Sequence, residues 1–382
     1  MNIQLLNLSR SQMSLAWAKA RHNQYSDTRK QIFHQNLEDL FKAISEFDFT
    51  SMTDDEKYEA RNIMEWFISS VNLLNNNTVN IIPYEMIECL NIASKEWLSD
   101  YDKYIIVTTD GPYAILISGD SLNIIYDTIK NKFGIDFQYR LLEIRMPRYL
   151  NRDYLTNVCL YHELGHFVDK RNKISETIVS RLYDQWHTQT TTRPEIKQSF
   201  PFITDFNSKN NKEIEQIYFH IREYFADIFA AQYVGQHIEN YLIYLAEDRK
   251  NIHDYEHPSL ELREIMINNF LSNNYNTVLN SIIEESKNIY MGKLQIQKRY
   301  IDLQKEDFYN LVPTQIQKES EIHSLFKLGW DIWMNNTEQI KICNKMQEEL
   351  LPDKTYEIIN NLIEKSINNY LIIRDWENFK KI

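Results

Sequence analysis

The segment HELGH, which runs from His162 to His166, combines two histidines and an acidic residue at a spacing suited to metal binding. On an α-helix, residues four positions apart leave the same face one turn apart, so both imidazoles can bind one ion. Glu163 lies beside them, where its carboxylate can take a proton from a water activated by the metal. The pattern therefore predicts a zinc site with Glu163 as the general base.

A catalytic zinc ion usually has three protein ligands, so the chain must supply one more. Glu223 lies 57 residues after His166, in the stretch IEQIYFHIREYFADIFAAQYV, which has strong helical character. Because Glu223 and Asp227 are one turn apart, a second helix packed on the first can offer Glu223 to the metal. Asp227 would then accept a hydrogen bond from the free ring nitrogen of a ligating histidine. Alanines around Asp227 would allow the close approach of the two helices.

A third element, HPSLELR at 257–263, places a histidine just before a proline that can open a helix. His257 or Arg263 can stabilise the oxyanion that develops on a scissile carbonyl. Alternatively, Arg263 can pair with Asp227 or with another buried carboxylate. The residues leave both possibilities open.

Other residues with metal-binding chemistry are expected to have structural roles. Cys159 precedes the first histidine by three positions, but a free cysteine is mostly a small buried apolar residue. His220 is expected to be a helix histidine with its own hydrogen-bond partner. Glu163 and His166 also form half of a di-iron signature, but the chain contains no second Glu-x-x-His.

Apolar periodicity predicts the elements that must position these residues. Residues 1–100 read as helices, and helical periodicity returns from 151 onward. Between 104 and 149, the short β-branched or aromatic runs YIIVTT, YAILIS and DFQYRLLEIRM predict a small antiparallel or mixed sheet. We therefore expect a predominantly helical α+β fold whose sheet precedes the metal-binding helix.

The composition narrows the classes of partner. The chain has 382 residues and a formal net charge of −12, which argues against nonspecific binding to nucleic acid or to anionic membranes. The N-terminal segment lacks the features of a signal peptide, and no apolar run approaches the roughly 18 residues of a spanning helix. Three cysteines, far apart, suit a reducing compartment. We expect a soluble cytoplasmic protein with no nucleic-acid or membrane partner.

HELGH, REYFADIFAA and HPSLELR, in this order, resemble the HExxH, ExxAD and HPxxxR motifs of the CaaX-type endopeptidases and their soluble bacterial relatives. This family belongs to the gluzincin clan of zinc metallopeptidases. The resemblance covers roughly residues 160–265. It implies His162, His166 and Glu223 as zinc ligands and Glu163 as the catalytic base.

The same resemblance implies roles for three further residues. Asp227 would orient a ligand, and His257 with Arg263 would lie near the oxyanion or behind the ligands. In gluzincins, an edge strand of the sheet before the metal helix receives the substrate as an added strand, and FQYRLLEIRM and YAILIS are the two candidates here. The membrane members of the family have spanning helices, which this sequence lacks, so a prenylated substrate is not implied.

A second resemblance is to the anti-repressor and radiation-response metallopeptidases, which are soluble regulators. They also show HELGH followed by a segment of the form E-x-x-A-N/D-x-F-A-A. In that family the two segments lie closer together and no HPxxxR element is expected, so this resemblance ranks second.

These observations predict three regions: helices at 1–100, a zincin-like metallopeptidase core at 101–270, and further helices at 271–382. The predicted function is a zinc-dependent endopeptidase that acts on a peptide or protein, with helical extensions that can bind a regulatory protein. The alternative is a noncatalytic zinc-binding regulator or sensor with a zincin-like fold. The presence of Glu163 disfavours it, because a purely structural site needs no base.

Overall fold

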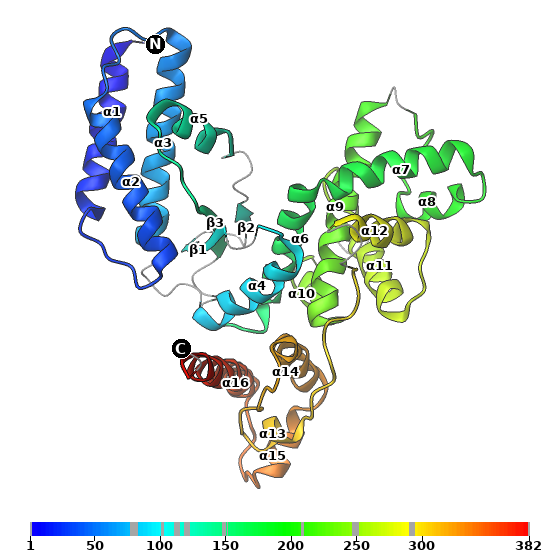
Figure 1. The fold of residues 1–382 in the computed structure, drawn as a ribbon. Helices are drawn as coiled ribbons and strands as arrows, with labels where there is room; N and C mark the ends of the chain where they lie inside the picture. Colours follow the sequence, from blue (N-terminus) through cyan, green and yellow to red (C-terminus); the bar gives the residue numbers. More distant parts are fainter. Residues whose placement is uncertain are drawn as a thin grey trace. The chain divides into compact units, whose positions relative to one another are not determined.

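The computed structural model describes residues 2–76, 83–100, 103–110, 115–117, 123–146, 150, 152–207, 210–246, 252–289 and 295–380 (Figure 1). The described part consists mostly of helices with one small sheet, which confirms the predicted α+β, predominantly helical class. The chain divides into two compact units. Unit 1 comprises Met1–Ile82 and Asp100–Tyr149, and unit 2 comprises Pro83–Ser99 and Leu150–Ile382.

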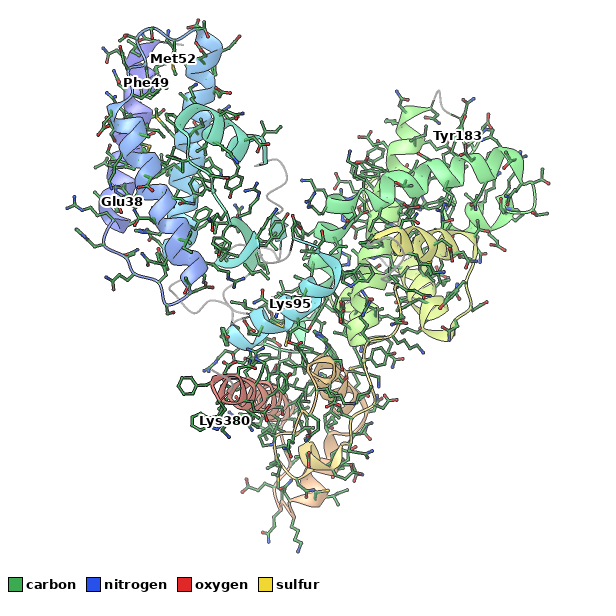
Figure 2. All side chains as sticks on the ribbon, viewed as in Figure 1. Glu38, Phe49, Met52, Lys95, Tyr183 and Lys380 are labelled. Carbon is green, nitrogen blue, oxygen red and sulfur yellow. The ribbon has the colours of Figure 1, made fainter. Side chains whose placement is uncertain are left out.

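Unit 1 packs helices around an aromatic core. Its described helices are α1 (Ile3–Ala20), α2 (Thr28–Glu46), α3 (Asp54–Asn76) and α5 (Asn123–Phe133). Asn2 and Asp27 cap α1 and α2, because each side chain accepts a backbone N–H of the first turn. Phe33 and Phe67 are fully buried, and Phe49, labelled in Figure 2, is buried in the connection between α2 and α3.

The sheet also belongs to unit 1 and has three strands in the order β1-β3-β2. The strands are β1 (Tyr104–Asp110), β2 (Ile115–Ile117) and β3 (Arg140–Met146). Because β3 runs parallel to β1 and antiparallel to β2, the sheet is mixed, one of the two predicted forms. β3 is paired on both sides, so the prediction that FQYRLLEIRM could be an edge strand is wrong; β2, in YAILIS, lies at an edge.

The two units group the chain differently from the three predicted regions. The sheet, which we predicted within the metallopeptidase core, packs with the N-terminal helices. The physical reason is a shared apolar core, in which Ile105, Val107 and Leu141 of the strands are buried with Phe33 of α2 and Phe67 of α3.

Unit 2 is a helical assembly in which α9 is the most deeply buried element. Its described α-helices are α4 (Tyr84–Trp97), α6 (Cys159–Asn172), α7 (Ile174–Thr188), α8 (Arg193–Ser199), α9 (Asn211–Val234), α10 (His237–Ala246), α11 (Leu260–Ser272), α12 (Thr277–Asn288), α13 (Glu306–Tyr309), α14 (Ser324–Asn335), α15 (Thr337–Cys343) and α16 (Pro352–Phe379). Every residue of α9 from Tyr224 to Val234 is buried. α6, α7 and α11 all pack against α9, which is therefore the scaffold for residues drawn from several helices.

Within the described part of the chain, no helix is both long and apolar enough to cross a membrane.

Candidate metal centre

The HELGH segment forms the middle of α6, and Glu223 and Asp227 lie on α9, as predicted. His162 pairs with Asp227, and His166 pairs with Glu223. Because the later residue of α6 meets the earlier residue of α9, the two helices run antiparallel. This arrangement turns both imidazoles of α6 towards the acidic face of α9.

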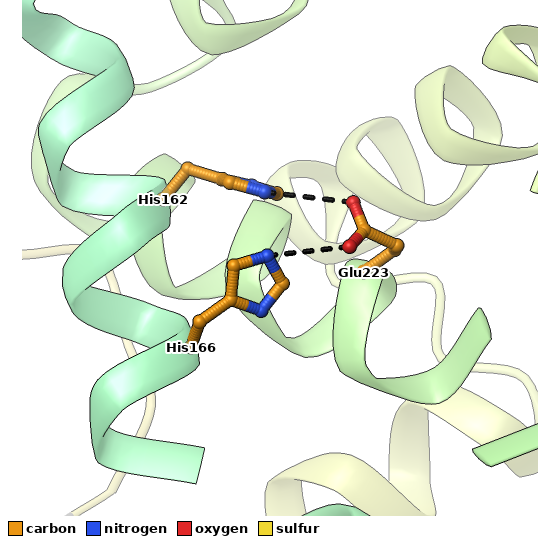
Figure 3. Close-up of side chains that lie close together, drawn as sticks. All are labelled: His162, His166 and Glu223. Carbon is orange, nitrogen blue, oxygen red and sulfur yellow. Dashed lines mark ion pairs between the residues drawn. The ribbon is translucent and has the colours of Figure 1, made fainter. Parts of the chain in front are cut away.

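Three side chains converge on one point between these helices. His162, His166 and Glu223 each offer a ligand atom, and these atoms all lie within 4.8 Å of one another. Nε2 of His166 is 3.2 Å from Oε1 of Glu223, and Nε2 of His162 is 3.5 Å from Oε2 (Figure 3). With metal–ligand bonds of about 2.1 Å, adjacent ligand atoms of a tetrahedral site lie roughly 3.4 Å apart. The observed spacing fits this value, so the group can hold a metal ion.

Asp227 and Arg263 form a layer behind the three ligand residues. Nδ1 of His162 lies 2.9 Å from Oδ1 of Asp227, a carboxylate that is completely buried. Arg263 donates to both oxygens of Asp227 at 2.7 Å, and its Nη2 is 3.2 Å from Oε2 of Glu223. Of the two possibilities that the sequence left open for Arg263, the structure therefore contains the pair with Asp227.

The charges in this layer act together on the pKa values. Burial would lower the pKa of His162, but the adjacent carboxylates of Asp227 and Glu223 outweigh it and raise the pKa to about 10. Burial would raise the pKa of Glu223, yet His166 and Arg263 hold it well below its ordinary value. The pKa of Asp227 is lowered against its burial as well, chiefly by Arg263. Both carboxylates are thus charged at neutral pH and favour a cation between them.

Gly165 and Ala226 permit the close approach of α6 and α9. A Cβ added at Gly165 would lie 2.9 Å from Cα of Ala226 and 3.0 Å from Cβ of Phe229. No side chain fits in that space, so the helices are in contact through their backbones. The glycine inside HELGH is therefore required by packing, and it brings the histidines within reach of Glu223.

Glu163 lies on α6 directly after His162 and is partly exposed. On a helix, adjacent residues are turned by about 100°, so Glu163 flanks the imidazole face without sharing it. The three-residue metal group does not include it. This placement is compatible with the predicted role of a base beside the ligands.

The recorded contacts of His257 are with Asp254 and not with the proposed ligand residues. Its side chain is 50% exposed, and Nδ1 lies 3.2 Å from Oδ1 of Asp254. Its backbone N–H also donates to Asp254, so His257 stabilises the turn before α11. Helix α11 begins at Leu260, and the side chain of Ser259 caps it by accepting the backbone N–H of Leu262. None of the contacts of His257 with the described residues reaches Glu223 or the two histidines.

Two of the residues assigned to structural roles have the expected surroundings. His220 is fully buried and donates from Nε2 to the backbone oxygen of Asp254 at 3.0 Å. Burial lowers the pKa of His220 to about 4, so it is neutral. Cys159 is buried, and it does not belong to the metal group found among the described residues.

The sequence analysis missed a polar cluster on another side of α6. Tyr161 has its hydroxyl 2.6 Å from Nδ1 of His323, and Tyr233 donates to Glu96 at 2.7 Å. Arg299 completes the cluster with an ion pair to Glu96 at 3.1 Å. These partners are separated by more than 100 positions in the chain, so no local spacing could have revealed them.

Comparison with known proteins does not assign the chain to a family. No family model matches the chain, and neither the curated proteins nor the solved structures give a match. Membership of the gluzincins, or of the second family considered above, therefore stays a prediction that rests on the motifs.

Proposed function

We propose that the protein is a zinc-dependent endopeptidase of the gluzincin type, with His162, His166 and Glu223 as the zinc ligands. The observation that carries the proposal is the convergence of these three side chains at the spacing of a tetrahedral site. Two histidines and one glutamate form a ligand set of catalytic zinc, whereas structural zinc usually has four protein ligands. The group found among the described residues has three members, which leaves one position for a substrate or water.

The surrounding residues have distinct roles in this proposal. A bound zinc ion lowers the pKa of a coordinated water towards about 7. Glu163 accepts the proton of the attacking water and later passes it to the leaving amine. Asp227, whose Oδ1 lies 2.9 Å from Nδ1 of His162, would orient this ring and leave Nε2 available as a metal ligand.

Arg263 is assigned to positioning, because its guanidinium is already bound to carboxylates. Its bidentate pair with Asp227 and its contact with Glu223 fix both acidic side chains relative to the histidines. His257 is the remaining candidate for the oxyanion, since among the described residues its half-exposed ring contacts Asp254 alone. The motif resemblance, rather than proximity to the ligands, supports that role.

The decisive experiment compares Glu163→Gln with wild type on a proteome-derived peptide mixture. Loss of the base is expected to slow cleavage by about 10²- to 10⁴-fold while the bound metal is retained. Glu261→Gln, which removes an exposed carboxylate in the first turn of α11, is the matched control and should cleave like wild type. Identical cleavage products from wild type and Glu163→Gln would reject the mechanism.

The same samples test the metal and the noncatalytic alternative. Mass spectrometry of the purified proteins should find one equivalent of zinc in wild type and in Glu163→Gln. Less than one equivalent of any divalent ion would overturn every zinc-based function. Stoichiometric zinc without any cleavage by wild type would establish the regulator or sensor in place of the peptidase.

A further inference from the structure

Arg222 is the residue before Glu223 on α9, and its guanidinium is not fully used by the protein. Its Nε is buried and has no hydrogen-bond partner among the described residues. An oxygen of Asp169 lies 3.8 Å from this Nε, which is an ion-pair distance but too long for a hydrogen bond. The side chain as a whole is 30% exposed, so a ligand can reach the part of the guanidinium that faces solvent.

Asp169 does not supply a hydrogen-bond acceptor to Arg222, because its Oδ2 lies 3.8 Å from Nε and its Oδ1 is bound elsewhere. Its Oδ1 accepts the backbone N–H of Ser175 at 2.7 Å, in the first turn of α7. With an exposed fraction of 1%, Asp169 is held in the interior by this contact. The aspartate thus connects α6 to α7 and only partly neutralises Arg222.

The position of Arg222 follows from the antiparallel contact of α6 and α9. The contacts His162–Asp227 and His166–Glu223 are followed by Asp169–Arg222. Asp169 lies three residues beyond His166, which is about 4.5 Å along the helix axis. Arg222 therefore lies roughly one turn from the metal ligands, close enough to contact a substrate held by the metal.

A second contact keeps the guanidinium in this place. Its Cζ lies 5.7 Å from the centre of the Tyr218 ring, one turn earlier on α9. Arg263 provides a contrast within the same site, because its two bonds to Asp227 leave its side chain only 11% exposed. Both oxygens of Asp227 bind Arg263, whereas Arg222 has no hydrogen bond of its side chain to the described residues.

A partly exposed, planar guanidinium is best matched by a carboxylate, which accepts two parallel hydrogen bonds. We propose that Arg222 binds a carboxylate of the peptide substrate, so that the enzyme selects peptides with a carboxylate near the scissile bond. The proposal rests on the peptidase function above and names its substrate class. The carboxylate belongs either to an acidic side chain or to the C-terminus of the peptide.

The test uses full-length zinc-loaded protein and matched peptide pairs. One pair differs by Glu or Gln at a position beside the cleaved bond, and the other carries a free or an amidated C-terminus. Wild type should cleave the carboxylate member with a kcat/KM higher by roughly 10- to 100-fold, mainly through KM. The pair that shows this ratio identifies the source of the carboxylate.

In Arg222→Gln the ratio of kcat/KM between the two peptides should fall to about one. Arg222→Lys should restore it in part, because lysine keeps the charge but lacks the two parallel N–H donors of the guanidinium. Lys212→Gln removes an exposed cation from the first turn of the same helix and should keep the wild-type ratio. Calorimetric binding of the same peptides to Glu163→Gln gives a readout without turnover. The preference for carboxylate should appear there too, and disappear on adding Arg222→Gln.

Two results would overturn the role of Arg222 alone: cleavage by wild type without any preference, or a preference that survives Arg222→Gln. Failure of the peptidase function looks different, since wild type would then cleave neither member of either pair. A thermal melt and the zinc content of each variant establish that folding and metal loading are intact.

Discussion

Two buried histidines, His162 on α6 and His323 in contact with Tyr161 of α6, have pKa values that shift in opposite directions. Burial lowers the pKa of His323 to about 3, with Arg299 adding to the effect. His162 is buried too, but Asp227 and Glu223 outweigh burial and raise its pKa to about 10. Burial by itself makes a histidine neutral, and only ionised carboxylates within contact distance reverse this. The difference distinguishes a site built for a cation from a polar part of the core.

Counting the charges explains this difference. The metal-side cluster consists of His162, His166, Glu223, Asp227 and Arg263. The rear cluster consists of Tyr161, His323, Tyr233, Glu96 and Arg299. In the rear cluster, one carboxylate is matched by one arginine. In the metal-side cluster, two carboxylates share one arginine, which leaves one negative charge for a proton or a metal ion to neutralise.

The largest expected difference between the clusters is in zinc binding after a histidine is removed from each. His166→Ala removes a ligand, so metal affinity should fall by more than the roughly 10- to 100-fold that follows loss of a residue behind a ligand. His323→Gln should keep the wild-type zinc content, measured by mass spectrometry after dialysis. Equal loss of zinc in both variants would show that the two clusters do not differ as we describe.

The arginines of the two clusters should also respond differently to zinc. Arg263→Met leaves two buried carboxylates without their cation and should lower the free energy of unfolding by about 3–5 kcal/mol in metal-free protein. Zinc should recover part of this loss, because it supplies positive charge at Glu223. Arg299→Met should destabilise the protein without any recovery by zinc. Urea denaturation with and without zinc measures both, and recovery in neither variant would contradict the charge count.

A pair of glycines tests whether close helix packing is specific to the metal side. Gly165→Ala places its Cβ 2.9 Å from the backbone of Ala226, so α6 and α9 must separate. We expect a loss of about 1–3 kcal/mol in the free energy of unfolding, together with weaker zinc binding. Gly329→Ala is the control, because its Cβ would meet side-chain atoms and no backbone: Cδ1 of Ile363 at 2.6 Å, Cδ2 of Leu155 at 3.0 Å and Cγ2 of Ile359 at 3.1 Å. Unchanged zinc affinity in Gly165→Ala would refute the packing argument.

The smallest expected effect is the pH dependence contributed by His323. The pKa of His323 is about 3 in the folded protein, below its ordinary value of 6.5, so the unfolded chain binds more protons as the pH falls. The stability it contributes is present above pH 6.5 and is lost as the pH falls towards 3. Between pH 7 and about pH 5.5, His323→Gln should lose about 1 kcal/mol less unfolding free energy than wild type. Denaturation at both pH values in a metal chelator measures this, and parallel losses would count against a neutral His323.

Much of the candidate site could be predicted, because its informative spacings lie within single helices. Residues four apart on a helix share a face, whatever the helix packs against. His162 with His166, and Glu223 with Asp227, were therefore correctly grouped before their helices were placed side by side. The fold class was predictable for a similar reason, since apolar periodicity is a local property.

Other features depended on packing between distant segments. From the sequence, Arg263 could contact either an oxyanion or a carboxylate. Only the packing of α11 against α9 places its guanidinium beside Asp227. Burial of Ile105 and Leu141 in the core of unit 1 decided where the strands pack. The weak pairing of Arg222 likewise depends on tertiary structure, which places Oδ2 of Asp169 3.8 Å from its Nε.

The sequence by itself determined which side chains share a helix face, and therefore which residues can act as ligands. Tertiary structure alone decided which charges meet across helices and which of them stay unbalanced. The physical reason is that helix geometry follows from backbone hydrogen bonds between residues four apart. The balance of buried charge depends on contacts between residues far apart in the chain, and this balance makes the environment of His162 favourable to positive charge.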